Sequence, residues 1–263
     1  MTHHTHLLAI DIGNTTVSFA VLKKKDVVQE YCLEQTLKSA VYDKKLKSIL
    51  NALEKKYMIR AVVICSVVPA ALKKIEKTVS RHYKGHVYVI GRNLKVPIKN
   101  KYKKPSAVGQ DRLVGAYAAK TLYGCPALII DFGTAITFDV VSQKGHYEGG
   151  IIVPGIRLSA ESLFSKTALL PRVDKIRRPK SLIGKTTRDS ILSGIFHGYA
   201  AMSDGLIQAI SQGFQTKPKV VVTGGHTELM NSYMKRKVDK VEPHLVFHGM
   251  RLLYESIIDS TQK

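Results

Sequence analysis

Two stretches of this chain share one pattern. Residues 9–21 read AIDIGNTTVSFAV, and residues 129–141 read IIDFGTAITFDVV. With a shift of 120 positions, the aligned identities are Ile10 with Ile130, Asp11 with Asp131, Gly13 with Gly133 and Val21 with Val141. In each stretch an apolar run leads to an aspartate and a glycine turn, and a second apolar run follows, which is typical of a β-hairpin. Two such hairpins predict a chain built from two similar lobes.

The remaining sequence alternates strand and helix patterns. Besides the two hairpins, strands are expected at 26–33, 61–66, 87–91, 149–156 and 220–225. Helices are expected at 38–57, 69–83 and 188–212, near Arg112, and from Pro243, because proline suits the first helical turn. This alternation indicates an α/β fold. We therefore expect two lobes, residues 1–115 and 116–263, each with one hairpin.

Composition limits the classes of function. The chain has 263 residues, 44% hydrophobic and 23% charged, as in ordinary globular proteins. No apolar run approaches the roughly 20 residues of a membrane helix, and the N-terminus has no secretory signal pattern. Three widely spaced cysteines, Cys32, Cys65 and Cys125, suit buried free thiols in a reducing compartment. We therefore expect a cytoplasmic protein without a membrane partner.

The net charge of +21 leaves a second class of function to consider. Such a surplus attracts polyanions, so a nucleic-acid-binding protein is a rival hypothesis. The basic runs, however, are scattered along the chain, and no helix-turn-helix, zinc-finger or aromatic RNA-binding pattern accompanies them. Solvated faces and loops explain most of this charge, and no specific nucleic-acid partner is expected.

The hairpins themselves suggest phosphate binding. A glycine turn after a buried strand presents backbone N–H groups to phosphate oxygens, and small residues allow close approach. The aspartate beside the turn suits a cation that offsets the repulsion between carboxylate and phosphate. One such turn is weak evidence, since plain hairpins contain it too, and a purely structural duplication is the alternative. Two turns in matching positions favour a nucleotide whose phosphates are held between the lobes.

A better-known phosphate motif is absent. The segment GKTT at 184–187 looks like the end of a P-loop, but that motif requires glycine where this chain has Pro179. The ATP-binding expectation therefore depends on the paired hairpins.

The paired hairpins resemble the phosphate-1 and phosphate-2 motifs of the superfamily of acetate and sugar kinases, heat-shock 70 proteins and actin. VVVTGG at 220–225 is similar to its adenosine motif. Within that superfamily the chain resembles type III pantothenate kinases along essentially its whole length, through DIGNT (11–15), YKKPSAVGQDR (102–112), DFGTAITFD (131–139) and EGGIIVPGI (148–156). The resemblance implies ribonuclease H-like lobes with mixed sheets flanked by helices, and an ATP cleft between them.

The resemblance also implies a reaction and its residues. ATP would phosphorylate pantothenate to 4'-phosphopantothenate, the first step of coenzyme A synthesis, with Mg²⁺ and a monovalent cation, K⁺ or NH₄⁺. The implied ATP-binding residues are Asp11, Ile12, Gly13, Asn14, Thr15, Thr16, Val17, Ser18 and Thr134. The implied pantothenate-binding residues are Tyr102, Gly109, Gln110, Asp111, Arg112 and Thr187. Asp111 would be the general base, Asp11 would bind Mg²⁺, and Asp131 would be associated with the monovalent cation.

Several of these residues have plainer interpretations. Asp111 could cap the helix that begins near Arg112, and Arg112 could form a surface ion pair. Thr186 and Asp189 have capping-box spacing, so Thr187 could simply belong to a helix start. His226 could stack on adenine or be an ordinary loop histidine.

The expected helix 188–212 bears on assembly. It is apolar on nearly all sides, which is typical of a buried helix. The family resemblance implies a homodimer, and this helix would lie at or near its interface. The remaining alternatives are a kinase of the same superfamily acting on another small alcohol, and a basic nucleic-acid-binding or regulatory protein.

Overall fold

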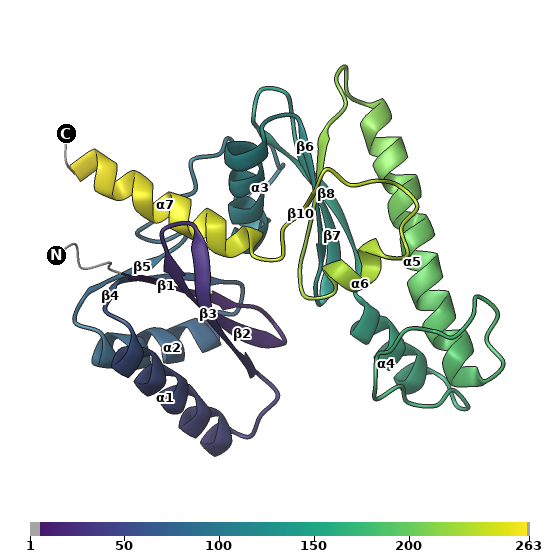
Figure 1. Ribbon diagram of the computed structural model, residues 1–263, viewed down its shortest axis with the longest axis horizontal. Helices are drawn as coiled ribbons and strands as arrows, with labels where there is room; N and C mark the ends of the chain where they lie inside the picture. Colours follow the sequence, from purple (N-terminus) through teal and green to yellow (C-terminus); the bar gives the residue numbers. More distant parts are fainter. Residues whose placement is uncertain (1–5, 262–263) are drawn as a thin grey trace. The chain divides into compact units, whose positions relative to one another are not determined.

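The computed structural model describes residues 6–261, and the chain forms two compact units (Figure 1). Unit 1 contains the chain up to Ile98, Lys103–Ala118 and the residues from His244 onward. Unit 2 contains Lys99–Tyr102 and Ala119–Pro243. Each unit has one five-stranded mixed sheet with helices packed on it, so the expected α/β fold of two lobes is confirmed.

The sheet of unit 1 follows the order β3-β2-β1-β4-β5. Its strands are β1 (His6–Ile12), β2 (Thr16–Lys23), β3 (Asp26–Glu34), β4 (Ile59–Ser66) and β5 (His86–Val89). The first three strands form an antiparallel meander, whereas β4 and β5 run parallel to β1. This hydrogen-bonding pattern puts the end of β1, with Asp11, in the middle of the sheet.

The sheet of unit 2 repeats this topology. Its strands are β6 (Ala127–Phe132), β7 (Ala135–Val141), β8 (Tyr147–Pro154), β9 (Lys219–Thr223) and β10 (Lys240–Val241), in the order β8-β7-β6-β9-β10. Again three antiparallel strands are followed by two parallel ones. Asp131 on β6 thus has the same place in its sheet as Asp11 on β1, as the sequence repeat predicted.

The two faces of the first sheet carry different helices (Figure 1). Helices α1 (Ser39–Lys56) and α2 (Pro69–His82) cover the even-numbered side chains of β1, such as Ile10. Helices α3 (Gln110–Tyr123) and α7 (Leu245–Thr261) cover the other face, where Ala9 leaves room for close packing. A Cβ atom on Gly249 would lie 2.6 Å from a methyl carbon of Val114, so α7 meets α3 at a glycine. A short 3-10 helix, η1 (Pro105–Ala107), precedes α3.

In unit 2, helices α4 (Ile156–Lys166), α5 (Thr187–Gln212) and α6 (Thr227–Asn231) share a core with one face of the sheet. The buried side of α5 includes Phe196 and Ile207, which pack with Ile130 and Phe138 of the strands. The opposite side of α5 is exposed and includes the small residues Gly194, Gly198, Ala201 and Gly205. Burial in the interior of unit 2 thus accounts for one side of this helix only.

Several boundaries differ from the expected ones. The strand expected at 149–156 is β8, Tyr147–Pro154, and the chain then turns at Gly155 into α4, which periodicity did not reveal. The last helix begins at Leu245 rather than at Pro243. All three cysteines are free thiols, but Cys32 is exposed and only Cys65 is buried, so the expectation of three buried thiols is wrong. Within residues 6–261, none of the helices combines the length and apolar composition that a membrane crossing requires.

Candidate active site

The first hairpin joins β1 to β2 through residues 13–15. The Gly13 N–H donates to the Thr16 carbonyl oxygen (3.0 Å), which closes the turn. Gln35, after β3, supports the turn from outside: its N–H donates to the Thr15 carbonyl oxygen (2.8 Å), and its side-chain amide donates to that of Gly13. A Cβ atom on Gly13 would approach only the Thr16 carbonyl oxygen, at an ordinary 3.4 Å. Packing in unit 1 thus does not explain why residue 13 is glycine.

The expected ATP-binding residues of this hairpin differ in how far their side chains are exposed. Ile12 and Val17 are fully buried in the core that α1 and α2 cover, so only their main chain is available to a ligand. Asn14 is exposed. Ser18 lies directly opposite Asp11 in the antiparallel register, on the same face of the sheet.

Asp11 shares its face of the sheet with a buried thiol and a second carboxylate. Cys65 on β4 is its partner in the parallel register. Burial, followed by the negative charges of Asp11 and Asp111, raises the pKa of the Cys65 thiol well above its usual value. Asp111, the proposed general base, and Asp11, the proposed metal-binding residue, are thus both close enough for their charges to act on the Cys65 thiol.

Asp111 lies in the first turn of α3, which begins at Gln110. Its Oδ1 accepts a hydrogen bond from the Arg112 N–H (2.8 Å), so this carboxylate does interact with a helix start. Gly109 makes room for it: a Cβ atom there would overlap Asp111 Oδ1 and lie 3.3 Å from Val67. The Gln110 side chain has a packing role, because it lies against the backbone of Gly91, whose φ is +85°. Arg112 is partly buried in the same turn.

The second hairpin is closed by Gly133 N–H, which donates to the Ala135 carbonyl oxygen (3.2 Å). Two glycines pack on it. Gly155 N–H donates to the Thr134 carbonyl oxygen (3.0 Å), and a Cβ atom at 155 would overlap that oxygen. Gly224 has φ +96°, and a Cβ atom there would overlap Asp131 Oδ1 and lie 2.8 Å from the Phe132 backbone. The expected adenosine motif is thus in direct contact with the expected second phosphate hairpin.

His226 follows that motif. Its N–H donates to the Phe132 carbonyl oxygen (3.1 Å), which ties the start of α6 to the hairpin. Burial, with a smaller effect from Arg157, lowers the pKa of His226. The ring is therefore neutral at physiological pH. A neutral ring is compatible both with stacking on adenine and with an ordinary loop histidine.

Tyr102 is held by the sheet of unit 2. Residues 99–101 run beside Tyr147, with paired backbone hydrogen bonds of 2.9 Å and 2.8 Å. Tyr147 is fully buried and donates from its hydroxyl to Asp139 Oδ1 (2.7 Å). The ring of Tyr102 lies 3.4 Å from where a Cβ atom on Gly149 would be. The buried Tyr147–Asp139 pair thus supports the segment that presents Tyr102.

Thr187 is the first residue of α5, and it is exposed. Thr186 caps that helix, accepting from the Asp189 N–H (3.1 Å) and donating to Asp189 Oδ2 (2.9 Å). This hydrogen bond, with Arg177, lowers the pKa of Asp189. The capping interpretation is confirmed for Thr186, and a substrate contact of Thr187 stays a prediction.

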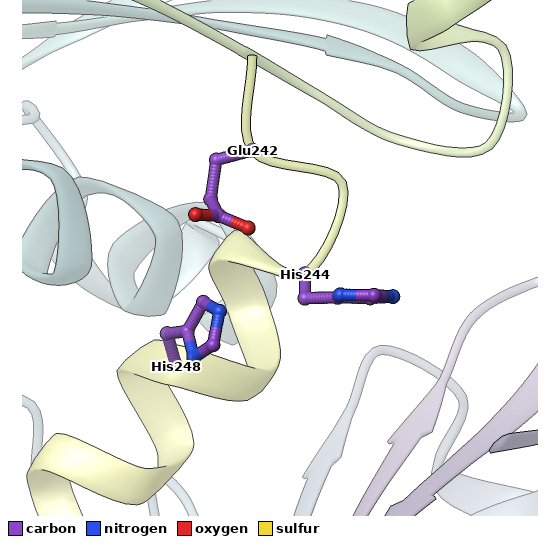
Figure 2. Close-up of side chains that lie close together, drawn as sticks. All are labelled: Glu242, His244 and His248. Carbon is purple, nitrogen blue, oxygen red and sulfur yellow. The ribbon is translucent and has the colours of Figure 1, made fainter. Parts of the chain in front are cut away.

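Figure 2 shows Glu242, His244 and His248 around the start of α7. His244 Nε2 lies 2.8 Å from Glu30 Oε1 on β3, and the rings of His244 and His248 have centroids 6.3 Å apart. Glu242 accepts a hydrogen bond from the Tyr123 hydroxyl (3.0 Å), and burial, followed by this hydrogen bond, raises the pKa of Tyr123 to about 12. Since His244 and Glu242 already have protein partners, we assign them to local packing.

Sequence reasoning missed the residues that support the hairpins. Gln35, Cys65 and Gly155 each lie 20 or more residues along the chain from the hairpin residues that they contact or pair with. The only available signal was Gly155, a glycine near the end of the strand expected at 149–156.

The fold defines a class of protein: two units that repeat one mixed-sheet topology, the fold found in a solved sugar kinase. The structure is similar to an inorganic polyphosphate/ATP-glucomannokinase from Arthrobacter sp. strain KM, with a TM-score of 0.50, 14% identity, and 96% of this chain and 99% of that one covered. It is also similar to a conserved protein named as a Baf family transcriptional activator from Campylobacter jejuni, with a TM-score of 0.60, 19% identity, and 96% and 99% covered. At these identities the likeness shows the fold alone.

The sequence gives the family. The model of the type III pantothenate kinase family matches residues 7–209. A type III pantothenate kinase from Persephonella marina (strain DSM 14350 / EX-H1) is 44% identical over 252 residues, which cover 94% of this chain and 98% of that protein. The chain belongs to the type III pantothenate kinase family, as the resemblance of its motifs predicted.

Proposed function

We propose that this chain transfers the γ-phosphoryl group of ATP to the hydroxyl group of pantothenate, which yields 4'-phosphopantothenate and ADP. This reaction is the first step of coenzyme A synthesis. The observation that carries the proposal is the 44% identity to a type III pantothenate kinase along nearly the full length of both chains. The arrangement of Asp11 and Asp111 in unit 1 supports the assignment of residues below.

The two hairpins bind the ATP phosphates. In the first hairpin, the phosphate oxygens are bound by backbone N–H groups of residues 13–16 and by the side chain of Ser18. In the second hairpin they are bound by Thr134. Asp11 binds Mg²⁺, a cation that prefers oxygen ligands. A second carboxylate is close by, because the charges of Asp11 and Asp111 both act on the buried Cys65 thiol. When bound, Mg²⁺ offsets the negative charge of the phosphates.

Asp111 is the general base. Its carboxylate accepts the proton of the pantothenate hydroxyl group as that oxygen attacks phosphorus, and phosphoryl transfer asks little else of a protein than positioning and charge stabilisation. Arg112 offers a planar guanidinium group that matches the pantothenate carboxylate or the transferred phosphoryl group. Tyr102, Gly109, Gln110 and Thr187 complete the pantothenate site.

Asp131 interacts with a monovalent cation, K⁺ or NH₄⁺. Its carboxylate lies against Gly224 in the second hairpin, where a cation would offset the repulsion between carboxylate and phosphate. The reaction takes place in the cytoplasm.

The protein acts as a homodimer through the small-residue side of α5. A Cβ atom on Gly194, Gly198 or Gly205 would meet no described atom within 4 Å, so packing within unit 2 does not explain these glycines. Their exposure along one side of a long helix suits close approach of a second copy.

A coupled assay of ADP release tests the proposal. With Mg²⁺ and ATP, ADP should form when pantothenate is present and only slowly without it, and the rate should rise when K⁺ or NH₄⁺ replaces Na⁺.

ADP release with another small alcohol instead of pantothenate would point to a different acceptor. ATP binding without transfer would point to a sensor. Sequence-specific DNA or RNA binding at physiological salt, with no ADP release, would favour the nucleic-acid alternative, since non-specific binding from +21 alone falls steeply with salt.

A further inference from the structure

Three oxygen-bearing side chains lie side by side across the sheet of unit 2. Asp131 on β6 is in register with Thr137 on β7 and with Thr223 on β9. Register partners point to the same face of a sheet, so a threonine hydroxyl flanks the Asp131 carboxylate on each side. Asp131 and Thr137 are partly exposed, whereas Thr223 is buried. We call these three residues the oxygen row.

The hydrogens of both hydroxyl groups are directed away from Asp131. Thr137 donates to Asp139 Oδ2 (2.9 Å). Thr223 donates to the Pro243 carbonyl oxygen (3.4 Å). A hydroxyl group has a single hydrogen and two lone pairs. Each threonine therefore offers oxygen lone pairs, rather than a donor, beside the Asp131 carboxylate, and oxygen lone pairs around a carboxylate are what a cation binds.

A buried network fixes the direction in which Thr137 donates. Asp139 is only 2% exposed, and its other oxygen, Oδ1, accepts from the hydroxyl of the fully buried Tyr147 (2.7 Å). A buried carboxylate depends on such donors, because burying a charge without hydrogen bonds is costly. Asp139 thus holds the hydrogen of Thr137 toward itself.

The corresponding places in unit 1 carry different chemistry. Asp11 is in register with Ser18 and with Cys65, so one of its two neighbours offers sulfur. Sulfur is a soft ligand, whereas K⁺ is bound by neutral oxygen dipoles. Since the two sheets share one topology, the difference lies in the side chains alone. One carboxylate between two neutral oxygens suits a cation of single charge.

We propose that the hydroxyl oxygens of Thr137 and Thr223 bind the monovalent cation together with the carboxylate of Asp131. Asp139 is a positioning residue, which acts through Thr137 and does not touch the cation. This inference rests on the role assigned to Asp131 under the proposed function. The alternative is that both threonines are ordinary strand residues, which β-sheets favour, and that their hydroxyl groups only form local hydrogen bonds.

The melting temperature tests the inference without an activity measurement. With Mg²⁺ and ATP present, replacing Na⁺ by K⁺ at constant ionic strength should raise the melting temperature of the parent protein, because a bound ligand stabilises the folded state. Thr137→Val keeps the shape of the side chain but lacks the oxygen. In this variant the K⁺ concentration that gives half of the maximal rise should increase about tenfold, as for the loss of one interaction at a metal site. Thr137→Ser keeps the hydroxyl group and should behave as the parent.

The matched control is Thr78→Val on α2. Thr78 is also partly buried, and its hydroxyl donates to the Lys74 carbonyl oxygen (2.9 Å). This variant loses the same group elsewhere and should keep the K⁺ dependence of the parent. An equal increase in Thr78→Val and Thr137→Val would overturn the inference, since it would be a general effect of a lost hydroxyl group.

Asp139→Asn tests the positioning role. Thr137 keeps its oxygen, but an amide N–H can donate to that oxygen, so the hydroxyl hydrogen is free to turn toward the cation. The K⁺ concentration for half of the maximal rise should therefore increase although no proposed ligand atom is lost. An unchanged value in the folded variant would overturn the role of Asp139.

Thr223→Val provides a second, independent test of the oxygen row, with the same expected increase. Parent-like K⁺ dependence in the folded Thr137→Val or Thr223→Val variant would overturn the inference and leave the proposed role of Asp131 intact. A parent protein whose melting temperature does not respond to K⁺ would overturn the role of Asp131 and the inference with it. ADP release with pantothenate would still support the proposed phosphoryl transfer in that case.

Discussion

Gly109 provides the space that the carboxylate of Asp111 occupies. A Cβ atom on Gly109 would overlap Asp111 Oδ1, while the other nearby atom, a methyl carbon of Val67, would lie 3.3 Å away. The constraint on residue 109 thus comes mainly from the carboxylate and much less from the core. Substitution at this position should therefore affect the chemistry more than the fold.

Gly109→Ala should displace the Asp111 carboxylate from its place at the start of α3. We expect turnover to fall at least ~10-fold, because a misplaced base loses part of the ~10²–10⁴-fold that proton transfer contributes. The melting temperature should change little. The matched control is Gly115→Ala on the same helix, where an added Cβ would meet no described atom within 4 Å. That control should keep full activity and gain up to ~1 kcal/mol of helix stability. Equal turnover in both variants would contradict the steric argument.

Asp111→Asn tests the base itself. The amide keeps the shape of the side chain and an oxygen that can accept from the Arg112 N–H, so the start of α3 should stay folded. Because the amide cannot take the hydroxyl proton, turnover should fall at least ~10²-fold while ATP and pantothenate still bind. Steady-state kinetics and calorimetric binding measure the two effects. Near-normal turnover would remove Asp111 from the mechanism.

Gly224→Ala should damage the second hairpin. The residue has φ +96°, and its Cβ would overlap Asp131 Oδ1, so the variant combines backbone strain of ~1–2 kcal/mol with a displaced carboxylate. We expect a lower melting temperature and a higher KM for ATP. The neighbouring Gly225→Ala is the control, since no described atom lies within 4 Å of its Cβ position. A smaller loss of stability in Gly224→Ala than in Gly225→Ala would show that this contact is not what fixes the hairpin.

Tyr147→Phe removes a donor from the buried carboxylate of Asp139, which also accepts from the Thr137 hydroxyl (2.9 Å). The free energy of unfolding should fall by ~1–3 kcal/mol, as expected for a buried charged acceptor that loses a hydrogen bond. Tyr83→Phe is a matched control, because Tyr83 is also buried but donates to a neutral carbonyl, that of Leu50 (3.2 Å). Its cost should be only ~0.5–1.5 kcal/mol. Denaturant unfolding of both variants measures these losses. An equal loss in the free energy of unfolding for the two variants would rule out a special role for Asp139.

Gly198→Glu tests the dimer. The side chain would point to open space in the isolated chain, so a monomer would tolerate it apart from its helix propensity, which favours Glu over Gly. If the small-residue side of α5 is the interface, the variant should elute as a monomer in gel filtration while the parent elutes as a dimer. A parent that is monomeric and fully active would contradict the assignment.

The hairpins, the α/β class and the repeat could be predicted because each depends on local features, namely strand alternation and a glycine turn. The partnership of Cys65 with Asp11 could not, since it arises from parallel strand register across a helical crossover, which no local pattern specifies. Helix α4 was missed because Gly155 turns the chain where the apolar run still looked like a strand. Gln35 was missed because its contact is with main-chain oxygens, for which many polar side chains would serve equally.

The placement of α7 has a consequence for how the protein is made. Its residues Phe247, Met250 and Leu253 cover the face of the first sheet that contains Ala9 and Val63, yet they follow all of unit 2 in the chain. Domains usually fold in the order in which the ribosome releases them. Here α3 can cover its part of that face early, but the part under Phe247, Met250 and Leu253 stays uncovered until residues 245–261 are available. The packing of unit 1 therefore depends on a helix that follows all of unit 2 in the chain.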